Sequence, residues 1–528
     1  MPHEYPLSNA IRMAYKTGQE DETLGPHVLA GSHNLPQGRI KNGDSVIFYN
    51  IRGEREIELS RSLTEKGFDK FPVEPDFSCD LTTMIQYHPD LRVSVAFPPD
   101  EIVEETLSDI LSAHHLIQVK ITEAEKAIHV GYFLNGKKTD PVDGERRIVV
   151  PTRKDVALFD EAPEMSIGAI TEATIGAIHD PGAHFIFTNF PNVDVVGHIE
   201  NEPAILHAVE AVDRHLGILV DEAIRRGMSV IITADHGTVE KWRYPDGTID
   251  TGHTDSPVPF ILIHDHHDQV LRQEGALSDI APTVLDLFGL PKPARMTGRS
   301  LIEKGQNTRA SKSKRLLFLL LDGWGEKPAG PGNLISLAET PRMEALKRDF
   351  PWTTLLSSGE AVGLPPGTVG NSEAGHLHIG SGRTVYSDRL KIDRAIEDGS
   401  FFQNRAFLKA INRSLETGTP LHLMGIVSFF SSHGSINHLF ALMDLARRSG
   451  IRELFIHAML GRRGELPESG AIYVERVEQK TREIGTGKVV SVIGRYWSMD
   501  REENWDRIEK TYRMLVSGQG IPVHEGEP

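Results

Sequence analysis

Short apolar runs bounded by polar and turn residues recur along the chain and predict a protein of alternating strands and helices. Such runs suit strands that are buried on both faces of a parallel sheet. Between them, apolar residues recur at helical spacing. In residues 202–226, Val209, Val212 and Leu216 share one face, and Gly227 follows as a helix stop. The predicted strands are residues 44–51, 184–190, 229–233, 260–263, 315–321, 454–457 and 489–493, and the predicted helices are residues 9–15, 202–226, 436–448 and 505–515.

Side chains of the kind that bind metal ions lie next to several of the predicted strands. Ligands of open α/β sheets bind beyond the carboxyl ends of the strands, so we expect these side chains to converge. Three histidines and three aspartates form a mixed nitrogen and oxygen set, which suits two divalent ions rather than one. The candidate metal ligands are Asp194, His198, Asp235, His236, His253 and Asp322.

Ser372 supplies a candidate nucleophile. It lies in GTVGNSEAGH, where glycines allow a tight turn and the following residues can open a helix whose N-terminal amides hold a phosphate. Two divalent ions about 4 Å apart clamp the attacking and leaving oxygens of a phosphoryl transfer, and a metal-bound hydroxyl loses its proton near neutral pH. The alternative is that Ser372 and the candidate metal ligands are unrelated surface and loop residues. Their shared position at strand ends argues against this alternative.

Composition sets mild limits on this picture. A chain of 528 residues is too long for one core, and 39% apolar with 25% charged residues is typical of a soluble globular protein. The single cysteine, Cys79, excludes an intramolecular disulfide and suits a reducing cytosol. No apolar run resembles a signal peptide or a membrane span. We therefore expect a cytoplasmic protein of two or more domains that has no membrane partner.

The net charge of −17 argues against nucleic acid as a partner. An anionic ligand would then need local cations, and arginines follow several predicted strands. Their guanidinium forks bind carboxylate and phosphate oxygens, so the set indicates a small dianionic or trianionic ligand. Surface pairing with nearby glutamates is the alternative, which we favour for Arg55 taken alone. The candidate cations are Arg52, Arg55, Lys126, Arg463, Arg495 and Arg501.

Taken together, the motifs resemble the cofactor-independent phosphoglycerate mutases of the alkaline phosphatase superfamily. The residues that carry the resemblance are Asp-Gly-Trp-Gly at 322–325, Gly-Asn-Ser-Glu-Ala-Gly-His at 370–376, Leu-His-Leu-Met-Gly at 421–425, Gly-Arg-Tyr at 494–496 and Asp-His-Gly at 235–237. The resemblance covers nearly the whole chain, but its two parts stand in the reverse order. Residues 5 to about 302 resemble the second part of the family, and residues 315 to about 520 resemble the first. The chain is thus similar to a circular permutant.

The resemblance implies an α/β fold with two domains. One is an alkaline-phosphatase-like, metal-binding domain with a mainly parallel sheet flanked by helices, expected in residues 101–302 and 314–387. Residues 303–313 are polar and read as the linker that joins the family's old termini. The other is an α/β transferase domain, expected from residues 1–100 and 388–528. Permutation is tolerated where termini lie close together on exposed loops. The family is commonly monomeric, so we expect a monomer.

The resemblance also implies a role for each candidate residue. Ser372 would take the phosphoryl group from 3-phosphoglycerate and pass it to the other hydroxyl of the bound glycerate, giving 2-phosphoglycerate, while Lys126 stabilises charge on that group. Two divalent ions are implied; we expect Mn²⁺, with Zn²⁺, Mg²⁺ and Co²⁺ as alternatives. Asp194, His198 and His253 would hold one ion, and Asp235, His236, Asp322 and Ser372 the other. The small phosphorylated substrate would be held by Arg52, Arg55, His433, Arg463, Arg495 and Arg501.

Departures from the family pattern fall in the part that handles glycerate. Residues 429–435 keep His433 but lose an aspartate and a second histidine, and residues 461–464 keep Arg463 but lose two aspartates. Asn504 replaces an arginine. Three functions stay open. The first, which the arginine set favours, is a phosphoglycerate mutase of glycolysis and gluconeogenesis. The second is a metal-dependent phosphatase or phosphotransferase for another small phosphorylated acid. The third is a non-catalytic binding protein, which the intact metal ligands disfavour.

Overall fold

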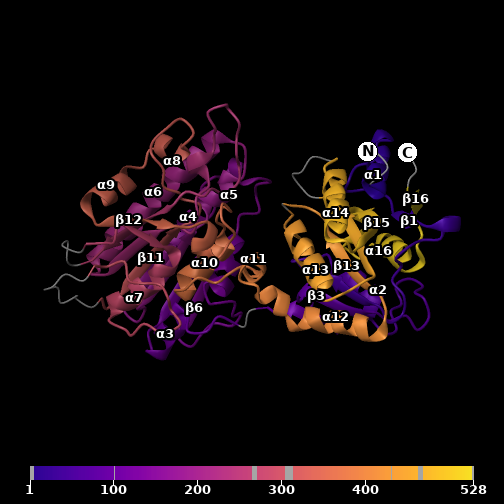
Figure 1. Cartoon of the computed structure of the whole chain (residues 1–528). Helices are drawn as coiled ribbons and strands as arrows, with labels where there is room; N and C mark the ends of the chain where they lie inside the picture. The colour runs from indigo at the N-terminus through magenta and orange to yellow at the C-terminus, as the bar shows by residue number, and fades with distance from the viewer. Residues whose placement is uncertain are drawn as a thin grey trace. The chain divides into compact units, whose positions relative to one another are not determined.

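The chain forms two units, and one of them is assembled from both ends of the sequence (Figure 1). The computed structural model describes residues 5–99, 102–264, 270–303, 313–429, 431–461 and 468–525. The first unit comprises Met1–Pro99 with Asp388–Pro528, and the second is the continuous segment Asp100–Ser387. Each unit has its own sheet and its own hydrophobic core. Residues 304–312 of the predicted linker lie outside the described residues.

The second unit is built on a mainly parallel sheet of order β10-β12-β9-β8-β11-β7-β5-β6. The five strands from β8 to β6 are parallel to one another, whereas β9 is antiparallel to both of its neighbours. The central strands are fully buried, which explains their unbroken apolar sequences. The strands are β5 (Gln118–Glu123), β6 (Glu145–Val150), β7 (Phe185–Phe190), β8 (Ser229–Thr233), β9 (Val258–Ile263), β10 (Glu274–Ala276), β11 (Leu316–Leu321) and β12 (Trp352–Leu356).

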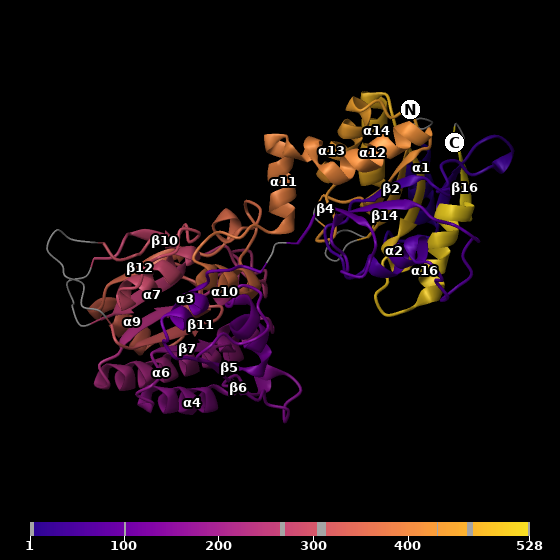
Figure 2. The same cartoon turned by 90° about the horizontal axis from the view of Figure 1, so that it is seen from below.

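Helices cover both faces of this sheet (Figure 2). Helices α4 and α6 lie on one face, and α3, α7 and α10 lie on the other. The long helix α6 begins where the Asn201 side chain accepts a hydrogen bond from the Ala204 backbone N–H, at 3.3 Å. The helices are α3 (Leu107–Ala113), α4 (Ile167–His179), α5 (Asn192–Gly197), α6 (Glu202–Arg225), α7 (Ile280–Phe288), α8 (Leu334–Leu337), α9 (Pro341–Asp349) and α10 (Ser372–Ser381).

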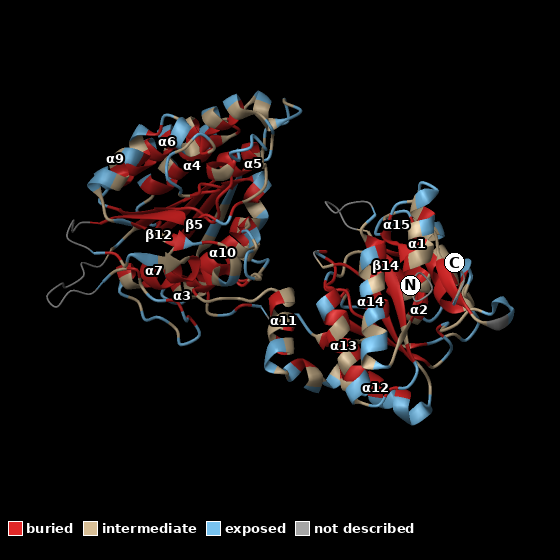
Figure 3. Ribbon diagram, turned by 45° about the horizontal axis from the view of Figure 1, so that its top comes forward, coloured by how far each residue is buried: buried red, intermediate tan, exposed pale blue. Residues whose placement is uncertain are grey.

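The sheet of the first unit interleaves strands from the two ends of the chain, in the order β16-β1-β15-β14-β13-β2-β3-β4. The parallel pairs β2–β13 and β1–β16 and the antiparallel pair β1–β15 join the two segments. Buried residues fill both sheets (Figure 3). The strands are β1 (His27–Ala30), β2 (Ser45–Phe48), β3 (Asp80–Ile85), β4 (Ser94–Phe97), β13 (Leu421–Ile426), β14 (Leu454–Leu460), β15 (Lys488–Gly494) and β16 (Ile521–His524).

Helices of the first unit also join the two ends of the chain. Glu478 of α14 is buried and accepts backbone N–H groups of Leu7, at 3.0 Å, and Ser8, at 3.3 Å, in the first turn of α1. This carboxylate satisfies donors that have no partner within the helix itself. The helices are α1 (Pro6–Lys16), α2 (Ile57–Thr64), α11 (Asp388–Asp398), α12 (Arg405–Thr417), α13 (Ile436–Arg448), α14 (Gly470–Ile484), α15 (Arg495–Ser498) and α16 (Trp505–Tyr512).

The α/β fold with mainly parallel sheets flanked by helices is confirmed, and each predicted strand and helix is present. Two elements are shorter than predicted by three residues or more. Strand β2 ends at Phe48, because the chain then turns and the Ile51 N–H donates to the His433 carbonyl oxygen at 2.7 Å. Helix α16 ends at Tyr512 and continues as a π-helical turn, Arg513–Ser517. None of the described helices combines the length and the apolar character that a membrane crossing requires.

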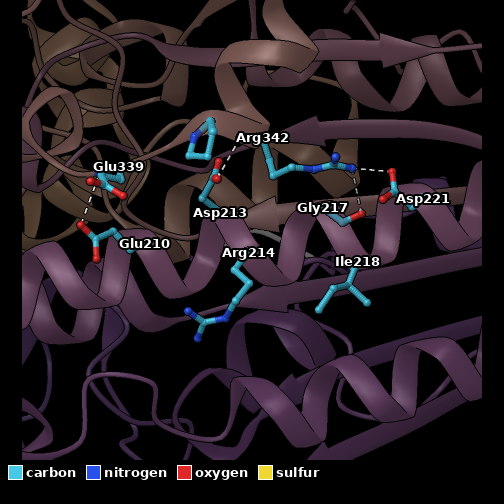
Figure 4. A pocket seen from close by; sticks show the side chains of 9 residues that line it. Glu210, Asp213, Arg214, Gly217, Ile218, Asp221, Glu339 and Arg342 are labelled. Carbon is cyan, nitrogen blue, oxygen red and sulfur yellow. Dashed lines mark hydrogen bonds and ion pairs between the residues drawn. The ribbon is translucent and has the colours of Figure 1, made fainter.

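A surface pocket of about 470 Å³ lies over α6 and α9, and the polar groups that line it hold these two helices together (Figure 4). Asp213 of α6 accepts the backbone N–H groups of Arg342, at 3.0 Å, and Met343, at 2.7 Å, in the first turn of α9. The Arg342 guanidinium bonds to Asp221 and to the carbonyl oxygen of Gly217, where a Cβ would collide with its Nε. These groups attach α9 to α6, and no predicted site residue lines the pocket.

Candidate active site

Neighbouring strands of the second unit deliver the predicted metal ligands to one edge of the sheet. Strands β8, β11, β7 and β5 are adjacent and parallel, so their carboxyl ends lie together. The residues that follow these ends are Asp235 with His236, Asp322, Asp194 and Lys126, in the same order. Strand β9 is antiparallel to β8, which brings its amino end and His253 to this edge. Ser372 opens α10, whose N-cap residue Asn371 accepts the Ala374 N–H at 2.8 Å.

Asp194, His198 and His253 form the first group. The Asp194 Oδ1 atom lies 3.2 Å from His253 Nε2 and 3.4 Å from His198 Nε2, and the two Nε2 atoms are 3.2 Å apart. The other ring nitrogens face carbonyl oxygens: His198 Nδ1 lies 2.7 Å from that of Thr251, and His253 Nδ1 lies 2.9 Å from that of Gly370. Carbonyl oxygens accept hydrogens, so both Nε2 lone pairs are left for a cation.

Asp235, His236, Asp322 and Ser372 form the second group, and all four are buried. His236 Nε2 lies 3.0 Å from Ser372 Oγ, 3.4 Å from Asp322 Oδ1 and 3.7 Å from Asp235 Oδ2. Asp194 Oδ1 is 3.8 Å from the same Nε2, so the two groups adjoin. The structure therefore brings together every ligand that the sequence predicted. The assignment of each ligand to one of the two ions stays a prediction that rests on the family resemblance.

Lys126 lies among these carboxylates. Its Nζ donates to Asp194 Oδ2 at 2.7 Å, to Asp322 Oδ1 at 2.9 Å and to Ser372 Oγ at 2.6 Å. Burial lowers the pKa of Lys126, but Asp322 and Asp194 outweigh burial and hold that pKa above its ordinary value. The ammonium group is thus charged and directly contacts the hydroxyl of the candidate nucleophile.

The charge balance of the site fits divalent cations. Burial lowers the pKa of His236, but the Asp235 and Asp194 carboxylates outweigh it and raise the pKa to about 10. The carboxylates thus hold a proton on an imidazole that a divalent cation would replace. In addition, His376 Nε2 is buried without a hydrogen-bond partner among the described residues. An unpaired buried polar atom is costly, and a bound ion would satisfy it.

His376 is a site residue that the sequence analysis did not single out. It lies one turn after Ser372 on α10, and its Nδ1 is 2.9 Å from the Ser372 carbonyl oxygen and 3.2 Å from Asp235 Oδ2. The spacing of four residues on a predicted helix could have found it, since residues i and i+4 share a face. Asn189 was also missed. This residue of β7 donates to Asp322 Oδ2 at 3.0 Å and so orients a predicted ligand.

Three predicted substrate arginines lie near one another in the first unit. The Glu54 carboxylate bridges Arg52, with Nε at 3.0 Å, and Arg501, with Nη1 at 3.2 Å. Arg55 Nη1 donates to the Met499 carbonyl oxygen at 3.0 Å. Arg52 and Arg501 are about half exposed, at 50% and 44% of their side chains. Ion pairing with a nearby glutamate, the alternative to anion binding, is therefore present for these two arginines.

The remaining predicted substrate residues have different surroundings. His433 is buried, with Nδ1 3.1 Å from Glu56 Oε1. Arg495 is also buried and begins α15, with Nε 3.5 Å from Glu22 Oε1. Arg463 lies outside the described residues. Asn504, where the family has arginine, donates to Asp500 at 3.0 Å.

Comparison with known proteins decides the family. A family model described as "Metalloenzyme superfamily" matches residues 17–292, which is more than half of the chain. The chain belongs to the metalloenzyme superfamily. Membership and the buried groups of aspartate and histidine together identify this edge of the second sheet as a divalent-metal site. A second model, described as "BPG-independent PGAM N-terminus", matches residues 392–526 of this metalloenzyme.

Curated relatives of this metalloenzyme match part of its length. It is 39% identical over 300 residues to the 2,3-bisphosphoglycerate-independent phosphoglycerate mutase of Moorella thermoacetica, and 42% identical over 303 residues to that of Thermomicrobium roseum. Each match covers 56% of this chain and 57% of the relative. A solved phosphoglycerate mutase of Leishmania mexicana, crystallised at low cobalt concentration, is 29% identical over 52% of this chain and 53% of that chain, with a TM-score of 0.38. The chain spans about half the length of the curated relatives it matches.

Proposed function

We propose that this metalloenzyme interconverts 3-phosphoglycerate and 2-phosphoglycerate through a phosphoserine at Ser372. One observation carries the proposal: Ser372 Oγ lies 2.6 Å from Lys126 Nζ, 3.0 Å from His236 Nε2 and 3.3 Å from Asp322 Oδ1. A hydroxyl at the start of a helix, beside metal ligands and a buried ammonium, is placed as a nucleophile for phosphorus. The names of the matched relatives give the proposed substrate.

Two divalent ions would be held by the two groups of ligands described above. We propose Mn²⁺, with Zn²⁺, Mg²⁺ and Co²⁺ as alternatives, because the ligand set suits each of them. When bound, the ions supply electrostatic stabilisation of the transferred phosphoryl group and acidify the Ser372 hydroxyl.

The chain's own residues would then carry the transfer. The Ser372 hydroxyl gives up its proton as Oγ forms a bond to phosphorus, and the glycerate 3-oxygen takes up one proton as its bond to phosphorus breaks. In the second half, the glycerate 2-oxygen gives up its proton and attacks phosphorus, and the released Ser372 oxygen takes up one proton. Lys126 remains charged throughout and donates to a phosphoryl oxygen, since the Asp322 and Asp194 carboxylates keep its pKa high.

For the glycerate carboxylate and phosphate we propose the cationic set of the first unit. Guanidinium forks bind such oxygens in a bidentate way, and a local arginine cluster offsets the overall charge of −17. Glu54 would then have to share Arg52 and Arg501 with the substrate. The proposed substrate residues are Arg52, Arg55, His433, Arg463, Arg495 and Arg501. We further propose that the enzyme is a cytoplasmic monomer.

We also propose that the chain is a circular permutant of the family. In support, the model described as the family's N-terminus matches residues 392–526, after the region 17–292 that the metalloenzyme model matches. The assembly of the first unit from both ends of the chain agrees with this order. On this proposal residues 1–100 and 388–528 form the transferase domain, and residues 101–302 and 314–387 form the phosphatase-like domain.

A second candidate function is a metal-dependent phosphatase or phosphotransferase for another small phosphorylated acid. The observation that favours it is the departure from the family pattern: residues 429–435 lose an aspartate and residues 461–464 lose two aspartates, as a changed substrate would produce. A non-catalytic binding protein is disfavoured, since the nucleophile, lysine and metal ligands are all assembled.

The deciding experiment supplies the manganese-loaded protein with 3-phosphoglycerate, without 2,3-bisphosphoglycerate. One aliquot is assayed for 2-phosphoglycerate and another for free phosphate. We expect 2-phosphoglycerate with little phosphate. Phosphate alone would favour the second candidate, and no reaction by the metal-loaded protein would contradict the proposed substrate.

A further inference from the structure

A buried carboxylate and imidazole form a pair in the first unit, and the proposed mechanism leaves the carboxylate without a role. Glu56 is fully buried, and its Oε1 lies 3.1 Å from His433 Nδ1. Two residues earlier, Glu54 is 38% exposed and pairs with arginines. Glu56 is therefore not an ordinary surface acid of this loop, because its side chain points inward to a histidine.

Hydrogen bonds fix the position of the carboxylate. Its Oε1 accepts from Asn50 Nδ2 at 2.7 Å, and its Oε2 accepts the Arg55 backbone N–H at 3.0 Å. Asn50 is itself held, because its Oδ1 accepts the Ile426 N–H at 2.8 Å. No described lysine or arginine side chain bonds to Glu56, so His433 is the titratable group that its carboxylate directly contacts. The acceptor is therefore rigid before any ligand binds.

The histidine is held from its own loop as well. The His433 N–H donates to Ser431 Oγ at 3.1 Å, and its carbonyl oxygen accepts the Ile51 N–H at 2.7 Å. The loops that follow β2 and β13 are thereby tied together, with Glu56 on one and His433 on the other. A histidine bound through Nδ1 to a fixed acceptor has its tautomer determined, because a carboxylate accepts the Nδ1 hydrogen. Nε2 makes no hydrogen bond with any described residue.

We propose that Glu56 is a positioning residue for His433, and that it presents Nε2 as an acceptor for a hydroxyl group of the substrate. This inference rests on the proposed function and adds to it, because it gives His433 a role in substrate binding that differs from the role of the arginines. Arginines have only donors and recognise the anionic oxygens of a phosphorylated acid, whereas an acceptor recognises a hydroxyl. The site would then select a small phosphorylated acid that carries a free hydroxyl.

The test combines a spectroscopic signature with activity. Nitrogen-15 NMR of the magnesium-loaded full-length protein reports which ring nitrogen of His433 is protonated, and His433→Gln assigns the signal. We expect Nδ1 protonated in the wild type and a mixture of tautomers in Glu56→Met. Glu56→Gln retains an acceptor oxygen and should restore the wild-type tautomer. Glu58→Met is the matched control, since Glu58 is buried on α2 but bonds the Glu503 N–H, not a histidine.

Activity and binding separate this inference from the proposed function. We expect kcat/KM with 3-phosphoglycerate to fall at least about tenfold in Glu56→Met, as a wrong tautomer impairs a histidine, and to recover in Glu56→Gln. Glycerate should shift the His433 Nε2 resonance, and propionate, which lacks hydroxyls, should not. An Nε2-protonated ring in the wild type, or equal shifts by both acids, would overturn the inference even if Glu56→Met fails to fold. If the wild type does not turn over 3-phosphoglycerate, only the proposed substrate is contradicted, because the tautomer of His433 is measured without substrate.

Discussion

Lys126 Nζ lies 2.6 Å from Ser372 Oγ, although 246 residues separate them in the chain. Both are buried, and the same Nζ also donates to Asp194 and Asp322. A buried ammonium offsets the repulsion between the carboxylates and, at the same time, directs one hydrogen at the nucleophile. This relationship links the stability of the site to its chemistry, and it makes both residues testable.

Ser372→Ala removes the proposed nucleophile. We expect turnover of 3-phosphoglycerate to fall at least about a thousandfold, because no other described hydroxyl accepts a hydrogen bond from Lys126, and we expect the fold to be unchanged. Ser381→Ala is the matched control on the same helix, since Ser381 is also buried but its hydroxyl donates to the Arg383 carbonyl oxygen, away from Lys126. Steady-state kinetics measures turnover by the two variants, and mass spectrometry detects whether each becomes phosphorylated. Activity near wild type in Ser372→Ala would remove Ser372 from the mechanism.

Lys126→Met keeps the length of the side chain but removes its charge. The metal-free variant should be destabilised by about 3–5 kcal/mol, because buried carboxylates lose their ammonium partner. Divalent cations neutralise the same carboxylates, so their addition should raise the melting temperature of the variant more than that of the wild type. Thermal unfolding with chelator and with Mn²⁺ checks this. Equal metal-induced shifts in the two proteins would show that Lys126 and the cations do not share these carboxylates.

His376→Ala tests whether His376 orients Asp235, one of the predicted metal ligands. His376 Nδ1 lies 3.2 Å from Asp235 Oδ2, so its loss should leave that carboxylate less well oriented. We expect metal affinity to fall by about 10- to 100-fold, as is common when a residue that supports a ligand is removed. His378→Gln is the control, because the His378 ring bonds to Ala374 and Val385 instead. Titration calorimetry with Mn²⁺ measures both variants, and equal affinities would remove His376 from the metal site.

Much of the site could be predicted because its residues have local signals. A central parallel strand is buried on both faces, so its sequence is a continuous apolar run, and the next polar residue lies at the functional edge. Asp322 after β11 and Asp235 after β8 were found in this way. The order of strands had no such signal. Strand β11 lies between β7 and β8, and that position depends on packing of the whole sheet rather than on the sequence around it.

Residues that act through long-range contacts could not be predicted. Glu56 is read from sequence as one of several acids in a polar loop, and only the pairing of β2 with β13 brings it to His433. In the same way, Glu54 reaches Arg501, which lies after β15, only through the order of the strands in the sheet. Sequence shows which side chains are present near a strand end, but contact between segments 377 residues apart depends on the fold.

A buried chain of hydrogen bonds in the first unit predicts how stability changes with pH. His422 of β13 lies 3.2 Å from Asp44 Oδ2 and 3.0 Å from His457 Nε2, and His457 Nδ1 lies 2.8 Å from Ser491 Oγ. All four side chains are buried. Burial, with a smaller contribution from His422, holds the pKa of His457 well below its ordinary value.

His457 should therefore destabilise the folded protein as the pH falls below about 6.5, the ordinary pKa of the unfolded side chain. Below that pH the unfolded chain binds a proton that the folded chain does not, which lowers the free energy of unfolding by about 1.4 kcal/mol per pH unit until the folded pKa is reached. His457→Gln keeps a polar side chain but removes this proton. We expect the variant to be less stable than the wild type at pH 7.5. Between pH 6.5 and pH 5.5, however, its free energy of unfolding should fall less than that of the wild type, and the difference should be roughly what uptake of one proton by the unfolded chain contributes. Denaturant unfolding at the three pH values measures the difference, and parallel pH dependence in the two proteins would show that His457 is not held neutral.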